Sequence, residues 1–263
     1  MAKPQENLPP RHTPLQPHRR AILVGASSGI GAALARQLAA EGYTLALLAR
    51  RADLLTAVCD DINASAGATR AVPYIHDVTD FDSVPGLLEK IVADLGGLDL
   101  FIYNSGISIP SGMKHYEFEK DRHVTEVNYL GALAWLNPVA SMFYNLKAGQ
   151  IVGISSVAGE RGRVGNPSYN ASKAALTCYL ESLRNRLTRR GVHVLTVKPG
   201  YVLTSMVDGV KNPLFAIPPE RAAADIVQAI HRHRQEIYTA PIWRLAMFTI
   251  RNIPSIVFRR MTF

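Results

Sequence analysis

The sequence contains only two cysteines, Cys59 and Cys178, among its 263 residues. Two isolated cysteines exclude a disulfide framework and a zinc site built on cysteine pairs. We therefore predict a reducing, cytoplasmic environment and no metal site. The chain also lacks a long uncharged apolar run, and this argues against a membrane-spanning helix.

Acidic residues are scarce near both ends of the chain, and this accounts for most of its net charge of +8. Residues 1–20 carry four basic residues and one acid, and residues 242–263 carry four arginines and no acid. The body between them is left with a net charge of +1. A nucleic-acid-binding domain would carry a basic face on its folded elements, so we expect no nucleic-acid partner.

The sequence divides into three segments of different composition. Residues 1–19 are rich in proline and lack an apolar core, which predicts a disordered lead. Residues 20–240 alternate short strands rich in Val, Ile and Leu with helices. This pattern predicts one α/β domain with a doubly wound, Rossmann-like parallel sheet and helices on both faces. We expect strands at residues 21–24, 44–48, 71–75, 98–103, 150–154 and 193–197, and long helices at 52–64, 84–95, 116–146, 169–189 and 219–232.

Residues 241–263 form a basic apolar extension that allows two interpretations. In the first, its large apolar side chains pack on the core or form a subunit contact. In the second, it is a basic amphipathic segment that makes peripheral contact with an anionic membrane surface. The sequence leaves both open.

A glycine-rich turn follows the first expected strand and opens a helix. Its residues are Gly25, Ala26, Ser27, Ser28, Gly29, Ile30 and Gly31. Glycines let the backbone approach a pyrophosphate, and the free N–H groups of the helix then meet the phosphates. The turn predicts a dinucleotide site, although glycines could also serve only to tighten a strand–helix turn.

Arg50 and Arg51 follow the second expected strand, where dinucleotide folds meet the adenosine ribose. An acid at this place favours a free 2′-hydroxyl, whereas arginine suits a 2′-phosphate. We therefore predict NADP(H) in preference to NAD(H). The alternative is a solvated pair of surface arginines.

Polar residues also follow the third and fourth expected strands. Open parallel sheets bind ligands at the carboxyl ends of their strands, so these residues are candidates for the same site. The polar residues are Asp77 after the third strand and Asn104 and Ser105 after the fourth, and the adjacent Val78 and Gly106 are candidates with them. Each polar residue could instead be an ordinary helix cap or turn residue.

Ser156, Tyr169 and Lys173 form the candidate catalytic group. Residues four apart share one helix face, so the Lys173 ammonium is expected beside the Tyr169 phenol, where it would lower the phenol pKa. Ser156 follows a strand and can donate a hydrogen bond to a carbonyl oxygen. A second pair with this spacing, Tyr116 and Lys120, has no serine thirteen residues earlier, and we regard it as coincidental.

These motifs together resemble the short-chain dehydrogenase/reductase family over residues 20–240. The resemblance implies that Asn128 completes a catalytic tetrad with Ser156, Tyr169 and Lys173, and that Tyr169 and Lys173 also contact the cofactor. It further implies a nicotinamide-binding segment made by Pro199, Gly200, Val202 and Thr204. A homodimer or homotetramer is expected on the same ground.

We therefore expect hydride transfer between a nicotinamide and a carbonyl or alcohol carbon, with Tyr169 exchanging the proton. The apolar loop at residues 202–219 favours a hydrophobic ketone or aldehyde as substrate. The competing hypothesis is a catalytically silent NADP(H)-binding sensor or scaffold. The intact catalytic tetrad argues against it.

Overall fold

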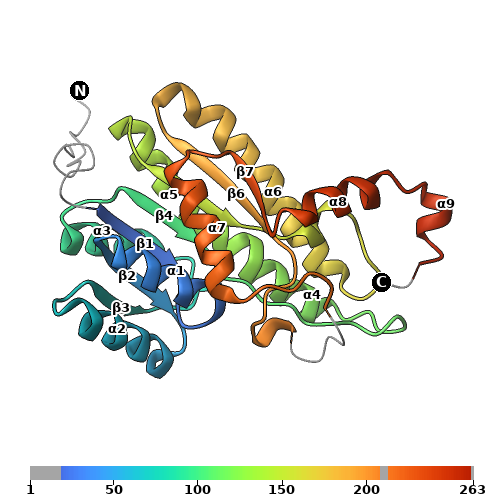
Figure 1. The fold of residues 1–263 in the computed structure, drawn as a ribbon, viewed down its shortest axis with the longest axis horizontal. Coiled ribbons are helices and arrows are strands. Elements are labelled where there is room, and N and C mark those ends of the chain that lie inside the picture. The colour runs from blue at the N-terminus through green and yellow to red at the C-terminus, as the bar shows by residue number, and fades with distance from the viewer. Residues whose placement is uncertain (1–18, 208–212, 262–263) are drawn as a thin grey trace.

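The computed structural model describes residues 19–207 and 213–261, and the predicted disordered lead lies outside them apart from Arg19. A seven-stranded parallel sheet forms the centre of the fold, in the order β3-β2-β1-β4-β5-β6-β7 (Figure 1). The strands are β1 Arg19–Val24, β2 Tyr43–Ala49, β3 Ala71–Ile75, β4 Leu100–Tyr103, β5 Gln150–Ile154, β6 His193–Pro199 and β7 Glu236–Thr239. The predicted doubly wound parallel sheet is confirmed.

Helices connect the strands and cover both faces of the sheet (Figure 1). They are α1 Gly29–Ala40, α2 Ala52–Ala66, α3 Val84–Leu95, α4 Phe118–Thr125, α5 Gly131–Leu146, α6 Pro167–Leu187, α7 Pro219–His231, α8 Ile242–Asn252 and α9 Ser255–Phe258. No helix within residues 19–207 and 213–261 is long and apolar enough to cross a bilayer.

Two elements differ from the sequence-based expectation. The single helix predicted for residues 116–146 is divided into α4, a π-helical turn at Glu126–Leu130, and α5. The short edge strand β7 is absent from the prediction. It has only four residues and exposes Glu236, so it lacks the buried apolar run by which the other strands are recognised.

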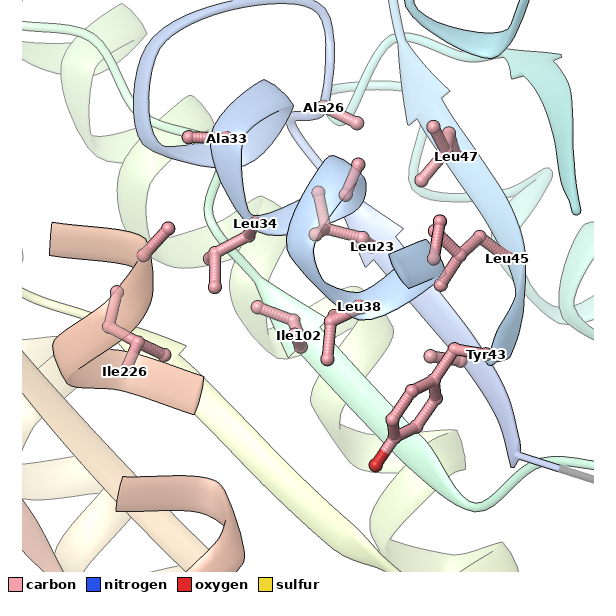
Figure 2. Packing of buried hydrophobic residues seen from close by; sticks show 14 of the residues in the cluster. Leu23, Ala26, Ala33, Leu34, Leu38, Tyr43, Leu45, Leu47, Ile102 and Ile226 are labelled. Carbon is pink, nitrogen blue, oxygen red and sulfur yellow. The ribbon is translucent and has the colours of Figure 1, made fainter. Parts of the chain in front are cut away.

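Buried apolar residues form one large cluster on each face of the sheet. Leu34 and Leu38 of α1 and Ile226 of α7 pack on one face against β1, β2 and β4 (Figure 2). Trp135 of α5 and Phe101 of β4 belong to the cluster on the other face, where their rings stack with centroids 5.9 Å apart. Burial on both faces explains why the central strands are nearly continuous apolar runs.

A buried ion pair holds the amino end of β1. Arg20 donates from Nε and Nη2 to the two carboxylate oxygens of Asp99, each at 2.9 Å. Its side chain is only 10% exposed. Arg20 is therefore a structural part of the domain, although it is one of the four basic residues among residues 1–20.

Candidate active site

A cleft of about 570 Å³ lies at the carboxyl ends of the strands. Its lining comes from the segments after β1, β2, β3 and β4, together with the loop after β6. The sheet order reverses between β1 and β4, which is where open α/β sheets bind nucleotides. The predicted cofactor residues that line the cleft are Gly25, Ser27, Ser28, Gly29, Ile30, Arg50, Arg51, Val78, Asn104, Ser105, Gly106 and Thr204.

The glycine turn packs closely against the end of β4. Gly25 has a φ of +88°, and a Cβ there would lie 2.7 Å from the backbone nitrogen of Ser105. A Cβ on Gly31 would overlap the Gly25 carbonyl oxygen, which accepts a 2.7 Å hydrogen bond from Asn104 Nδ2. Gly31 therefore permits the close packing of this turn without itself lining the cleft.

The N-terminus of α1 is open to a ligand. The Ser28 side chain does not cap it, so the first N–H groups of the helix remain available for an anion. Glycine at positions 25 and 29 keeps the approach free of side chains. This cradle fits a dinucleotide pyrophosphate.

Arg51 reaches back to the glycine turn. Its Nη2 donates hydrogen bonds to Ser27 Oγ at 3.0 Å and Ser28 Oγ at 2.6 Å. The guanidinium of Arg51 and the serine hydroxyls therefore form one polar group at the rim of the cleft, beyond the end of β2.

Asp77 does not line the cleft, and its side chain lies between Arg50 and Thr79. Arg50 Nη1 is 3.5 Å from Oδ2, and the Thr79 amide and hydroxyl both donate to Oδ1. Burial acts to raise the pKa of Asp77, but these hydrogen bonds and the Arg50 charge lower it overall. The carboxylate is thus held in its charged form.

Lys173 and Asn128 meet beside Gly106. A Cβ on Gly106 would lie 3.1 Å from Lys173 Nζ and 3.3 Å from Asn128 Oδ1. Asn128 stands in the π-helical turn, and its amide bonds to both the N–H and the carbonyl of Ile107. Such turns occur frequently at functional sites, and this one fixes the Asn128 amide against the cleft wall.

Lys173 is 3% exposed. Its Nζ donates to the Ile154 carbonyl at 2.9 Å. Burial lowers the pKa of Lys173 to about 8, because a charged ammonium is poorly solvated there. The residue can therefore lose its charge near neutral pH.

Tyr169 and Ser156 are brought together from α6 and the end of β5. Burial raises the pKa of Tyr169, whereas a hydrogen bond with Ser156 and the charge of Arg163 act to lower it. The net direction is opposite to the one predicted from Lys173. The Lys173 ammonium donates to a backbone carbonyl, and its Nζ lies 5.9 Å from the centroid of the Tyr169 ring.

The segment after β6 lies next to Ser156. Ser156 Oγ is 3.5 Å from the Pro199 carbonyl and accepts a 3.1 Å hydrogen bond from the Ala158 amide. Of the four residues predicted to hold the nicotinamide, only Thr204 lines the cleft. Gly200 packs under Trp243, and Val202 forms an isolated bridge with Ile217.

Several cleft residues were missed by sequence reasoning. Ile107, Ser108 and Ile109 directly follow Gly106, so extending the strand-end argument by three residues would have found them. His76 directly follows β3, and burial lowers its pKa. His123 of α4 also lines the cleft, but no local pattern marks it.

The second tyrosine–lysine pair forms no comparable site. Tyr116 is 91% exposed, and Lys120 Nζ donates to the Pro110 carbonyl at 2.6 Å. The same spacing therefore occurs once beside the candidate cleft and once on an open surface.

Comparisons with known proteins agree with this geometry. The model of the short chain dehydrogenase family matches residues 19–213. An uncharacterized oxidoreductase of Myxococcus xanthus is 38% identical over 189 residues, covering 72% of this chain and 74% of the relative. The ketoacyl reductase HetN of Nostoc sp. is 32% identical over 221 residues, covering 82% of this chain and 76% of the relative.

A solved structure has the same fold. The crystal structure of a short-chain type dehydrogenase/reductase from Mycobacterium marinum superposes with a TM-score of 0.77 and is 26% identical. The match covers 90% of this chain and 96% of that one. The chain therefore belongs to the short-chain dehydrogenase/reductase family and is an oxidoreductase.

Proposed function

We propose that the protein is an NADP(H)-dependent reductase of a hydrophobic ketone or aldehyde. The proposal rests on one observation, which is that the phosphate cradle and the candidate catalytic residues lie next to each other. The phosphate cradle at α1 and Gly106 line one cleft, Lys173 lies directly beside Gly106, and the Tyr169 hydroxyl lies 3.9 Å from the sulfur of Met206, which also lines the cleft. A nucleotide and a carbonyl compound can therefore be held next to each other.

Each catalytic side chain has a role that its surroundings support. A nicotinamide held in this cleft would supply or accept the hydride. Tyr169, whose pKa is raised, keeps its proton and can give it to the substrate oxygen. Ser156 orients that oxygen, and Lys173, with Asn128 beside it, holds the ribose and connects the phenol to a source of protons.

The preference for NADP(H) rests on Arg51 and Arg50. Both guanidiniums line the cleft beyond β2, and Arg51 already binds hydroxyl oxygens of the phosphate turn. A 2′-phosphate can replace these weak acceptors with a charged one, which strengthens the hydrogen bonds. Asp77 is engaged by Arg50 and Thr79, so it offers little repulsion to that phosphate.

The substrate class is inferred from apolar side chains at the mouth of the cleft. Ile109 and Met206 line it, and the loop beyond Met206 exposes Leu214 and Phe215. The Nostoc relative is named a ketoacyl reductase, which supports a ketone on an apolar chain. No feature within the described residues favours the catalytically silent sensor.

Assembly and location are further parts of the proposal. We infer a cytoplasmic homodimer or homotetramer with α5 and α6 at the contact. Leu130, next to α5, is 40% exposed and Tyr144 of α5 is 41% exposed, so this surface offers apolar area to a second copy. Light scattering on the purified chain measures the number of copies, and a monomer would refute this assembly.

The function is tested by scanning ketones and aldehydes of increasing chain length with NADPH and with NADH. We expect turnover with NADPH that improves as the apolar chain lengthens. Tight NADPH binding without turnover of any carbonyl compound would overturn the proposal in favour of the sensor. Equal use of both cofactors would overturn the NADP(H) preference alone.

A further inference from the structure

Helix α8 carries apolar side chains on two opposite faces. Trp243 and Met247 point into the body and are 6% and 2% exposed. Ile242, Leu245 and Phe248 recur every third residue on the other side and are 42%, 64% and 61% exposed. A surface helix of a globular protein normally has one apolar stripe and one polar face. The outer stripe of α8 therefore requires a separate explanation.

The inner stripe fixes α8 rigidly to the catalytic domain. Trp243 packs over Gly200, where a Cβ would overlap the indole ring. At the other end of α8, Arg161 donates to the Ile250 and Arg251 carbonyls at 2.6 and 2.9 Å. The same guanidinium lies 3.9 Å above the Phe258 ring of α9. The outer stripe is thus held in a defined orientation.

Cationic side chains accompany the outer stripe. Residues 242–263 contain Arg244, Arg251, Arg259 and Arg260 and no acid. Arg244, Arg259 and Arg260 form no ion pair with any residue in the described ranges, and Arg251 approaches Glu160 only to 3.8 Å. Ile256 and Val257 of α9 add 56% and 51% exposed apolar side chains. Apolar and cationic side chains therefore occur together on α8 and α9, which lie at one end of the molecule (Figure 1).

A groove beside α8 combines both kinds of side chain. It has a volume of about 510 Å³ and is lined by Arg244 and Arg251 together with Leu245 and Phe248. Glu236 also lines it, but the Lys198 ammonium lies 2.7 Å from that carboxylate and offsets its charge. The groove thus offers guanidiniums to a phosphate and apolar walls to an acyl chain.

We propose that α8 and α9 form a docking surface for an anionic lipid membrane. Apolar side chains enter the boundary between headgroups and acyl chains, and arginines bind the lipid phosphates. A second copy of the chain fits this surface less well. A two-fold contact would place the four arginines of one copy against the four arginines of the other. Neither copy of the segment has an acid that would offset this positive charge.

This docking would bring the loop that contains Phe215 to the membrane. Trp243 contacts the rings of Tyr201 and Phe215, with centroids 5.8 and 5.9 Å apart. Phe215 belongs to the apolar loop that follows the cleft residue Met206 in the chain. In so far as the proposed function holds, an apolar carbonyl compound could pass from the membrane directly to that loop. The docking itself does not depend on catalysis.

The experiment is vesicle flotation with the full chain. One set of vesicles is phosphatidylcholine and the other is an equal mixture of phosphatidylcholine and phosphatidylglycerol. We expect flotation only with the anionic vesicles, and added salt should weaken it. Leu245→Ser with Phe248→Ser should reduce the partition coefficient by more than about tenfold. Arg244→Gln should reduce it about fivefold.

Matched variants elsewhere on the surface serve as controls. Leu54→Ser removes a 45% exposed apolar side chain from α2, and Arg189→Gln removes an exposed arginine after α6. Both should float like the unmodified chain. NADPH binding, measured by fluorescence, verifies that every variant is folded and also separates this proposal from the proposed function.

Three outcomes would overturn the proposal. The first is absence of flotation with anionic vesicles. The second is equal loss of flotation in the α8 and control variants. The third is an oligomer that Leu245→Ser with Phe248→Ser converts to monomers while flotation is unchanged. That last result would assign the surface to a contact between copies.

Discussion

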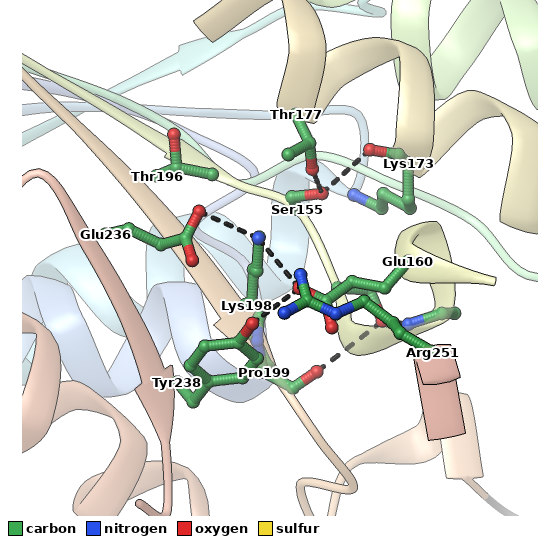
Figure 3. Close-up of polar contacts among 12 residues, drawn as sticks. Ser155, Glu160, Lys173, Thr177, Thr196, Lys198, Pro199, Glu236, Tyr238 and Arg251 are labelled. Atoms are coloured by element: carbon green, nitrogen blue, oxygen red, sulfur yellow. Dashed lines mark hydrogen bonds and ion pairs between the residues drawn. The ribbon is translucent and has the colours of Figure 1, made fainter. Parts of the chain in front are cut away.

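The Lys198 ammonium lies 2.8 Å from Oε1 of Glu160, and both side chains are almost completely buried (Figure 3). Lys198 stands directly before Pro199 at the end of β6, and Glu160 stands four residues after Ser156. Tyr238 of β7 donates to the same carboxylate oxygen at 2.5 Å. One charged cluster therefore ties the segment after Ser156 to the last two strands.

This relationship predicts a large loss of stability from Lys198→Met. The change leaves the buried Glu160 with Arg251, 3.8 Å away and half exposed, as its remaining cationic neighbour, and breaking a buried pair in this way costs about 3–5 kcal/mol. Urea unfolding measures the loss. Changing both residues to methionine should recover most of it, because an apolar pair replaces an ion pair with little net cost. A double variant as unstable as Lys198→Met would contradict this account.

Tyr169→Phe should abolish most of the reductase activity. It removes the phenolic proton that we assign to the substrate oxygen, and general acid catalysis contributes about 10²- to 10⁴-fold. The NADPH dissociation constant should change little. Tyr116→Phe is the matched control, since that residue has the same spacing to a lysine but is 91% exposed. Comparable kcat values for the two variants would show that Tyr169 does not handle the proton.

Arg51→Gln should raise the KM for NADPH and leave that for NADH nearly unchanged. The side chain is proposed to bind the 2′-phosphate, which only NADPH carries. Hydrogen bonds to a charged group contribute about 1.5–3 kcal/mol, equivalent to roughly tenfold to hundredfold in affinity. Arg189→Gln, on an exposed turn, controls for the change in net charge. A parallel rise of both KM values would refute the assignment.

Affinity for NADPH should fall as the pH rises through about 8. Burial lowers the pKa of Lys173 to about 8 from its ordinary value, so the unliganded protein loses this positive charge above that pH. Binding that requires the charged form must then protonate Lys173 first, and the dissociation constant should approach a tenfold rise per pH unit. Tyr169, whose pKa is raised, stays protonated over this range.

Fluorescence titration with NADPH at successive pH values measures this dependence. Lys173→Arg is the control, because a guanidinium keeps its charge throughout the range. Its affinity need not equal that of the unmodified chain, but it should not vary with pH near 8. A dependence that persists in Lys173→Arg would place the titrating group elsewhere.

Local patterns were sufficient for most of the sheet and for the nucleotide turn. Strands such as β2 are continuous apolar runs because both of their faces are buried, and this is visible in the residues themselves. The turn from Gly25 to Gly31 can be recognised in the sequence, because only glycine tolerates the close packing of this turn against β4. The grouping of Ser156 with Tyr169 also follows from the order of strand and helix.

Properties that depend on contacts between distant segments could not be predicted from the sequence. The pKa of Tyr169 is raised because the phenol is buried, and spacing along a helix reports neither this burial nor the contact of Lys173 with Ile154. The π-helical turn that presents Asn128 divides a helix that had looked continuous. Strand β7 is too short and too polar to be recognised until β6 pairs with it.

The sequence by itself determined the α/β fold, and it marks the glycine turn and the candidate catalytic side chains, because each of these depends on residues that are close together in the chain. Only the tertiary structure decided how the C-terminal segment divides its apolar side chains. Trp243 and Met247 are buried because Gly200 and Val157 lie beneath them. Leu245 and Phe248 remain outside with the arginines. Burial is a property of the whole chain, and no pattern within α8 distinguishes its two apolar faces.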